Sequence, residues 1–242
     1  IRSCLVGSEM CIRDSVEADT VAHCGDSISG KFIWSLTITD VYSGWTDNRA
    51  MFHKTADGTL SAIGSIVKNL PYDLHSFNVD NGTEFLNRYL VEFFEGQRAS
   101  LTRSRAYRKN DNCHVEQKNF THVREYFGYD RLDEERLVKY MNEIYRFYLN
   151  PLLNFFTPQL KLTQKERVGS RYVRKYDSPK TPYQRLMESS HLSMKQKADL
   201  ELAFKRLNPI MLKKRLSSEL KQFQRLLHLS LIHISEPTRQ DR

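Results

Sequence analysis

The segment LHSFNVDNGTEF, residues 74–85, joins a predicted strand to a predicted helix. Its first half is a short apolar run typical of a buried strand, and the run ends directly on a carboxylate, Asp80. Asn81-Gly82 follows as a turn signal, and residues 84–96 repeat apolar side chains at helical spacing up to Gly96. A charge at the end of a strand protrudes while the strand stays buried, so Asp80 is a candidate functional residue.

The residues on either side predict a mixed sheet covered by helices. β-branched and aromatic residues dominate 16–22, 31–41 and 45–52, with turn signals between them, which predicts an antiparallel meander. Further strands are predicted at 74–79 and 99–102, and helices at 59–70, 84–96, 110–128 and 133–148. Asn110 or Asp111 is expected to cap the third helix, and Asn150-Pro151 to end the fourth. This order predicts an α/β fold, in which helices flank a mixed five-stranded sheet made of the three-strand meander plus two further strands.

Charge is distributed unevenly along the chain, whose formal net charge is +8 over 242 residues. Up to Tyr148 there are 18 Lys and Arg against 21 Asp and Glu, whereas from Leu149 to His228 there are 17 against 6. This distribution favours carboxylate chemistry beside a surface that binds a polyanion, with a solvated helical tail as the alternative. No apolar run reaches the roughly 20 residues of a membrane helix, so no membrane partner is expected.

The two ends of the chain are expected to be foreign to it. CLVGSEMCIRDS (4–15) and LSLIHISEPTR (229–239) resemble translated sequencing adapters, so 1–15 and 229–242 are interpreted as artefacts. Between them we expect a core domain over 16–148, a basic extension over 149–190 and a helical tail over 191–228, the last two forming a mainly helical C-terminal part. An apolar stripe on the tail predicts packing against the preceding helix or another protomer.

Two further carboxylates have positions that suit a shared site with Asp80. Asp19, in EADTV, lies near the end of the first strand, and Glu116 lies on the helix that follows a basic loop. Converging carboxylates repel one another unless a hard cation such as Mg²⁺, which prefers oxygen ligands, lies between them. There are 35 residues between Asp80 and Glu116; Asp130 and Glu166 have the same interval, but no strand precedes Glu166.

Two alternatives to these ligands come from the same region. Asp40, after LTIT, is an alternative to Asp19, although its place before Ser43-Gly44 favours bracing a turn. Zinc is disfavoured at His23-Cys24 and at Cys113-His114, because neighbours on a strand point to opposite faces. Of the four cysteines, only Cys24 and Cys113 lie outside the adapter-like ends, and two thiols without a metal-binding spacing indicate a reducing cytosol rather than a disulfide framework.

Cations gather just before Glu116, with no acid among them. They are Arg98, Arg103, Arg105, Arg108 and Lys109. Together with Lys118 and Arg124 on the following helix, they are predicted to bind DNA phosphates, with a solvated loop as the alternative. Residues 161–185 interleave tyrosines with cations, a pattern typical of an arm that follows DNA.

Five motifs occur in order along the chain: VEADTVAHCG (16–25), LTITDVYSGW (36–45), DNGTEFLN (80–87), TRSRAYRKNDNCHVEQKN (102–119) and SPKTPYQRL (178–186). Together they resemble the catalytic region of bacterial insertion-sequence transposases of the DDE type, which belong to the retroviral-integrase superfamily. The resemblance covers about 16–187. It implies an RNase H-like fold and two Mg²⁺ or Mn²⁺ ions held by Asp19, Asp80 and Glu116 as the catalytic residues.

The same resemblance implies an activity and its partners. The activity is metal-dependent DNA cleavage and strand transfer, the transposition of an insertion sequence. The partners are transposon ends, target DNA and further copies of the chain, in a bacterial cytoplasm close to the nucleoid. An RNase H-like nuclease that only hydrolyses, and an inactive DNA-binding remnant of a mobile element, are the alternatives.

Overall fold

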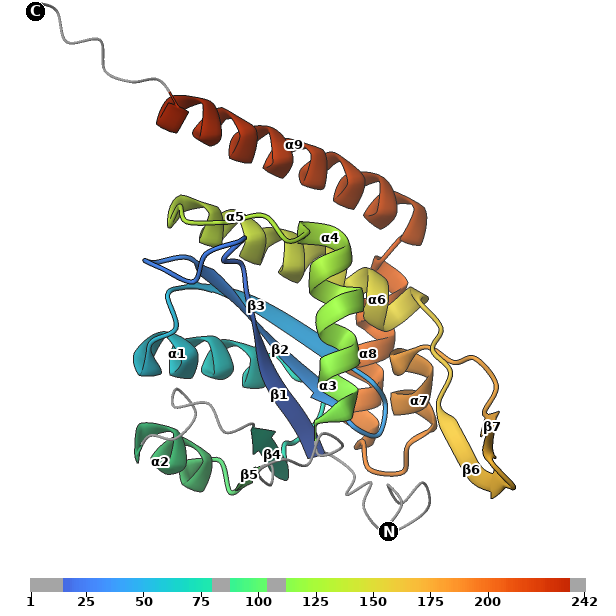
Figure 1. Ribbon diagram of the computed structural model, residues 1–242. Coiled ribbons are helices and arrows are strands. Elements are labelled where there is room, and N and C mark those ends of the chain that lie inside the picture. The colour runs from blue at the N-terminus through green and yellow to red at the C-terminus, as the bar shows by residue number, and fades with distance from the viewer. Residues whose placement is uncertain (1–14, 80–87, 104–111, 236–242) are drawn as a thin grey trace, which may run out of the picture.

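A five-stranded mixed sheet lies at the centre of the protein. The computed structural model describes residues 15–79, 88–103 and 112–235, with 228–235 as backbone alone (Figure 1). The strands are β1 (Ser15–Ala22), β2 (Ile33–Asp40), β3 (Thr46–Phe52), β4 (Ser76–Val79) and β5 (Ser100–Arg103). Their order is β3-β2-β1-β4-β5; the first three form an antiparallel meander, and β4 and β5 continue the sheet in parallel with β1. The predicted sheet is confirmed.

Helices pack on both faces of this sheet. The helical segments are α1 (Ala56–Val67), α2 (Arg88–Gly96), α3 (Cys113–Lys118), η1 (Asn119–Arg124), α4 (Glu125–Phe127), α5 (Arg136–Ile144), η2 (Tyr145–Leu149), α6 (Asn150–Phe156), α7 (Pro182–Glu188), α8 (Met194–Arg206) and α9 (Pro209–Ser235). The two η segments are π-helical. Within the described residues, every helix is too short or too polar to span a lipid bilayer.

Successive strand residues point to opposite faces, and this alternation divides the core into two clusters. Val16 and Ala18 of β1 face α1 and contribute to a cluster with Ile63 and Ile66. The other face carries Ile33, Ala50 and the apolar sides of α5 and η2. The tail helix α9 packs on this second cluster and lies across α5 in Figure 1 (red), so its apolar stripe is covered by its own chain.

The edge strand β3 is closed by asparagine side chains from the helices above it. The amide of Asn142 accepts a hydrogen bond from the Ala50 N–H (2.8 Å) and donates one to the Ala50 carbonyl (2.9 Å). Asn154 makes the same pair of bonds with Thr46, at 2.9 and 2.8 Å. An unpaired strand edge is a site of aggregation and of unsatisfied backbone groups, and these amides take the place of a neighbouring strand.

The prediction that Asn150-Pro151 ends a helix is wrong. The helix that begins at Arg136 passes through the π-helical turn η2 and continues as α6 to Phe156, with Pro151 in the first turn of α6. Proline removes one N–H donor from a continuous helix and crowds the preceding turn, and the wider η2 turn, in which the Asn150 N–H bonds the Tyr145 carbonyl, changes the hydrogen-bonding pattern just before it. The expected domain boundary at 148/149 falls inside this continuous helical stretch.

We expect Asn142→Ala and Asn154→Ala each to lower the free energy of unfolding by about 2 kcal/mol, because each leaves a buried edge N–H and C=O without partners. Urea unfolding monitored by circular dichroism measures this change. Asn69→Ala, at an exposed site, is the control and should stay within about 0.5 kcal/mol of the parent. Similar small effects for all three variants would contradict this role.

Candidate functional site

Asp19 lies on the central strand of the sheet, half-buried and opposite Thr37 of β2. The prediction that it lies near the end of this strand is wrong, because β1 continues in register with β2 to Ala22. On the other side of β1, Ala18 pairs with Val79 of the parallel strand β4. The next residue after Val79 is Asp80, which falls outside the described residues. The two strands that the sequence assigned to the first two acids are therefore direct neighbours, in register, up to the residue before each acid.

Glu17 fixes the helix that carries Glu116. It shares the face of β1 that carries Asp19, and it is buried. Its Oε2 atom accepts hydrogen bonds from the N–H groups of His114 (2.9 Å) and Val115 (3.0 Å), in the first turn of α3. Helix N-terminal N–H groups have no intrahelical partner and attract negative charge, so this carboxylate satisfies the helix end and is itself compensated.

The start of this helix differs from the prediction. The N-cap residue is Asn112, later than the predicted Asn110 or Asp111, and its side chain makes no capping bond. The Asn112 Oδ1 atom instead accepts a hydrogen bond from the Nδ2 atom of Asn78 (2.7 Å). Asn78 is the register partner of Glu17 on β4. Neighbouring residues of two parallel strands therefore hold the start of α3.

Asn119 makes a second connection between this helix and β1. Its Nδ2 atom donates to Oδ2 of Asp19 (2.7 Å), while the Thr20 N–H donates to Oδ1 (2.7 Å). The π-helical segment η1 begins at Asn119, and its Oδ1 atom is buried with no hydrogen-bond partner among the described residues. Glu116 lies three residues earlier, hence on the same side of the helix, and is exposed. The helix is thus tied to β1 on both sides of Glu116.

The oxygen donors around Asp19 suit a hard divalent cation. Mg²⁺ takes carboxylate and water oxygens and shares its coordination shell with substrate phosphates. Asp19 and Glu116 lie on adjoining elements, and no described residue donates a hydrogen bond to the Glu116 carboxylate. The described ranges alone contain no group of three or more His, Cys, Asp or Glu that could hold a metal. Completion of such a site depends on Asp80.

The predicted DNA-binding cations have different environments. Arg103 is exposed at the end of β5, whereas Arg105, Arg108 and Lys109 lie outside the described residues. The Lys118 ammonium donates to Oε1 of Gln159 (2.5 Å), and burial, followed by the nearby Lys161, lowers its pKa to about 8. DNA contact by these residues stays a prediction.

Arg124 is engaged by the protein itself. Its guanidinium donates to the carbonyls of Ala22 (2.8 Å) and Gly128 (3.2 Å), and it lies over the Tyr129 ring, 4.7 Å from the centroid. It therefore ties the end of η1 to the end of β1. Its predicted DNA contact would be made by a side chain that already has a structural role.

Asp40 and His23, which the sequence offered as alternative ligands, both have structural roles. The Asp40 carboxylate accepts hydrogen bonds from the N–H (2.6 Å) and hydroxyl (2.5 Å) of Ser43, which confirms that it braces the β2–β3 turn. Burial raises the pKa of Asp40. The His23 Nε2 atom bonds the hydroxyl of Ser35 (2.9 Å), which also bonds Tyr145, and burial, followed by Arg124, lowers the His23 pKa to about 3. His23 is therefore a neutral core residue.

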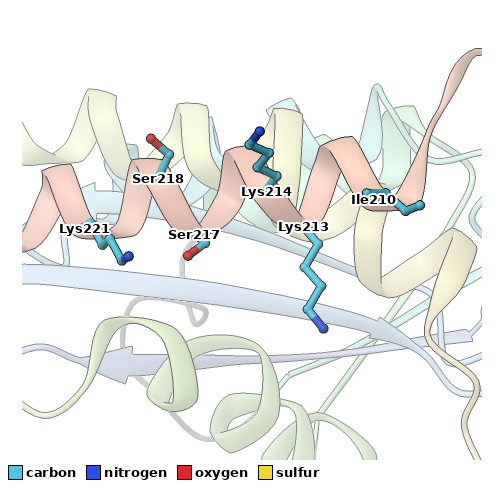
Figure 2. Close-up of a pocket in the computed structure, with 6 residues that line it drawn as sticks. All are labelled: Ile210, Lys213, Lys214, Ser217, Ser218 and Lys221. Carbon is cyan, nitrogen blue, oxygen red and sulfur yellow. The ribbon is translucent and has the colours of Figure 1, made fainter.

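A cationic surface also runs along the outer side of α9. Figure 2 shows a shallow hollow on this helix, lined by Ile210, Lys213, Lys214, Ser217, Ser218 and Lys221. Glu219, an acid on the same helix, accepts a hydrogen bond from the Tyr140 hydroxyl (2.6 Å) on the side facing the core. The sequence indicated the apolar stripe of this helix and the positive charge of its region, but not this hollow.

Comparisons with known proteins identify the fold. No family model matches the chain. It is similar to the uncharacterized protein y4rM of Sinorhizobium fredii (strain NBRC 101917 / NGR234), with 36% identity over 173 residues, 70% of this chain and 48% of the relative. The chain thus spans about half the length of the curated relative it matches.

Two solved structures resemble the fold. One is the simian T-cell lymphotropic virus intasome in complex with the PP2A regulatory subunit B56 gamma, with a TM-score of 0.50, 14% identity, and coverage of 77% of this chain and 58% of that chain. The other is the catalytic core domain of BIV integrase in crystal form I, with a TM-score of 0.46, 16% identity, and coverage of 74% and 97%. The protein has an RNase H-like fold, a mixed five-stranded sheet with flanking helices, and the intasome chain shares this fold.

We expect Glu17→Ala to destabilise the protein by about 2 kcal/mol, because two helix N–H groups lose a charged acceptor. Amide exchange at His114 and Val115 should accelerate, as measured by hydrogen exchange. Glu17→Gln, which keeps an acceptor oxygen, should lose less, and Glu95→Ala, at an exposed site on α2, should change little. Unchanged exchange at Val115 in Glu17→Ala would contradict the capping role.

The lowered pKa of Lys118 predicts a pH dependence of stability. Between about pH 8 and 10.5 the unfolded chain binds the Lys118 proton and the folded chain does not, so stability gains from this group as the pH rises. Relative to Lys118→Met, the parent should therefore gain thermal stability from pH 8 to 10. Parallel melting temperatures across this range would contradict the shift.

Proposed function

We propose that this chain is the catalytic core of a DDE-type DNA transposase, a polynucleotidyl transferase that cleaves DNA and joins a DNA 3′ end to a target strand. The observation that carries the proposal is the connection of Asp19 to the Glu116 helix through Asn119, on a strand paired with the one that leads to Asp80. The integrase-like fold and the five sequence motifs support it. Fold alone does not decide function, so the site carries the argument.

Two of the three proposed ligands, Asp19 and Glu116, have neighbours among the described residues that hold them in place. Asp19, Asp80 and Glu116 would hold two Mg²⁺ or Mn²⁺ ions, which supply activation of an attacking oxygen and stabilisation of the leaving oxygen at phosphorus. Asn119 fixes the orientation of the Asp19 carboxylate, because it donates a hydrogen bond to one of the two carboxylate oxygens. Glu17 positions the helix of Glu116 without reaching the substrate.

DNA and further copies of this chain are the proposed partners. Transposon ends and target DNA would bind beside Arg103, at the end of β5, and the cations that precede Glu116, since phosphate contacts orient a duplex for cleavage. The viral neighbour is an intasome, and we extend the expectation of an oligomer on DNA to this chain as part of the proposal. A bacterial, nucleoid-associated location belongs to the same proposal.

The test is a joining assay with a labelled DNA end, a plasmid target, and Mg²⁺ or Mn²⁺. We expect Asp19→Asn, Asp80→Asn and Glu116→Gln each to reduce cleavage and joining by at least about 100-fold, equivalent to roughly 2.7 kcal/mol in the barrier. DNA binding by each variant should remain close to that of the parent. Glu125→Gln, an exposed change farther along the same helical stretch, is the matched control and should stay active.

Three results would count against this function. Parent-like joining by Asp19→Asn or Glu116→Gln would remove the catalytic assignment. Nicks without joined products, from the parent protein, would favour a nuclease that only hydrolyses. Salt-sensitive DNA binding without any metal-dependent cleavage would favour an inactive DNA-binding remnant.

A further inference from the structure

The basic extension contains a two-stranded hairpin that the sequence-based reading of 149–190 did not predict. Its strands are β6 (Leu162–Val168) and β7 (Arg171–Tyr176), joined at Gly169. Figure 1 shows it projecting at one side of the molecule, apart from the five-stranded sheet. Residues 163–176 are all exposed, so neither face of the hairpin is covered by the described part of the chain.

The register divides the hairpin into two faces of different charge. Cross-strand partners lie on the same face, and Lys165 pairs with Arg174 and Arg167 with Tyr172. These four residues, Lys165, Arg167, Tyr172 and Arg174, form what we call the cationic face, which contains no acid. The opposite face carries Gln164, Glu166, Val168, Arg171, Val173 and Lys175, and so mixes both signs with apolar side chains.

The cationic face contains an unfavourable pairing that an anion would relieve. Lys165 and Arg174 are directly opposite each other, and like charges in a cross-strand pair are destabilising. The Lys165 ammonium lies 4.7 Å from the centroid of the Tyr172 ring, which holds it on this face. The Arg167 Nε atom donates to the Gly169 carbonyl (3.2 Å). Exposed cations on a ribbon, without an ion pair to an acid among the described residues, are suited to a phosphate backbone.

The base of the hairpin is fixed to the helix that carries Glu116. Oε1 of Gln159 accepts the hydrogen bond from Lys118, two residues after Glu116 in the chain. Asp177, at the end of the hairpin, accepts hydrogen bonds from the Lys161 N–H (2.7 Å) and from the Arg185 guanidinium (2.5 Å). The first contact joins the base of the hairpin to the helix that carries Glu116, and the other two close this base and join it to α7.

We propose that the cationic face of the β6–β7 hairpin binds the phosphate backbone of duplex DNA and holds the duplex beside the candidate site of Asp19 and Glu116. The inference rests on the proposed function for the identity of the polyanion. Two-stranded ribbons fit a DNA groove, and contacts to phosphates fix the register of a duplex without reading its sequence. The opposite face, with Glu166, faces away from the DNA.

The test compares two double variants that remove two positive charges each from the same hairpin. Arg167→Ala/Arg174→Ala changes the cationic face, and Arg171→Ala/Lys175→Ala changes the opposite face. Binding of a 30-base-pair duplex is measured by fluorescence anisotropy at several salt concentrations, with circular dichroism as the folding control. We expect the first variant to weaken binding at least tenfold near 0.1 M salt and to reduce the slope of log K against log salt by about 1.8, and the second to change binding less than threefold.

Equal losses in the two variants would overturn the inference, because they would show a response to net charge rather than to one face. No loss in Arg167→Ala/Arg174→Ala would overturn it as well. Cleavage by the parent protein separates this result from the proposed function. If the parent cleaves DNA and the two variants bind alike, the inference alone fails; if the parent binds through the cationic face but never cleaves, the proposed function alone fails.

Discussion

The buried carboxylate of Glu17 is the contact on which the arrangement of the site depends. An ionised carboxylate is costly to bury unless hydrogen bonds compensate it, and the free N–H groups at the start of α3 provide that compensation. The contact joins residues almost a hundred positions apart in the sequence, and it fixes α3 against β1, the first strand of the sheet. Asn119 adds a second contact, to Asp19, and Glu116 lies between the two.

The edge strand β3 is held by side-chain hydrogen bonds from helices in a similar way. Asn142 and Asn154 satisfy the outer backbone groups of β3, and Asn150 donates to Asp47, which pairs with Arg49 at 2.6 Å. In both places a polar side chain from a helix satisfies groups that would otherwise be buried without partners. The helical stretches that carry these side chains each contain a π-helical segment: η1 begins at Asn119, and η2 directly precedes Asn150. The wider π-helical turns therefore occur close to the residues that bond the sheet.

The sequence was sufficient to place the five strands along the chain and to predict the meander of the first three, since alternation and turn signals act locally. It also indicated the turn at Asp40, because an acid just before Ser43-Gly44 has a local hydrogen-bonding role. It was not sufficient for Glu17, because nothing in the local sequence distinguishes this structural carboxylate from the candidate metal ligand Asp19, two residues later on the same strand. The continuation of the helix through Pro151 depends on a π-helical turn, which has no reliable sequence signal. The β6–β7 hairpin did have one: Gly169-Ser170 between two runs that contain Val, Tyr and Thr.

In the proposed site, Glu17 and Asn119 hold the Glu116 helix so that Asp19 and Glu116, together with Asp80, bind divalent metal. Anomalous diffraction from crystals soaked in Mn²⁺ tests this arrangement. We expect an anomalous peak bonded to a carboxylate oxygen of Asp19 at about 2.1 Å, with Asp80 or Glu116 in the same coordination shell, and no such peak in Asp19→Asn. Mn²⁺ bound only elsewhere, with the Asp19 and Glu116 carboxylates directed away from each other, would contradict it.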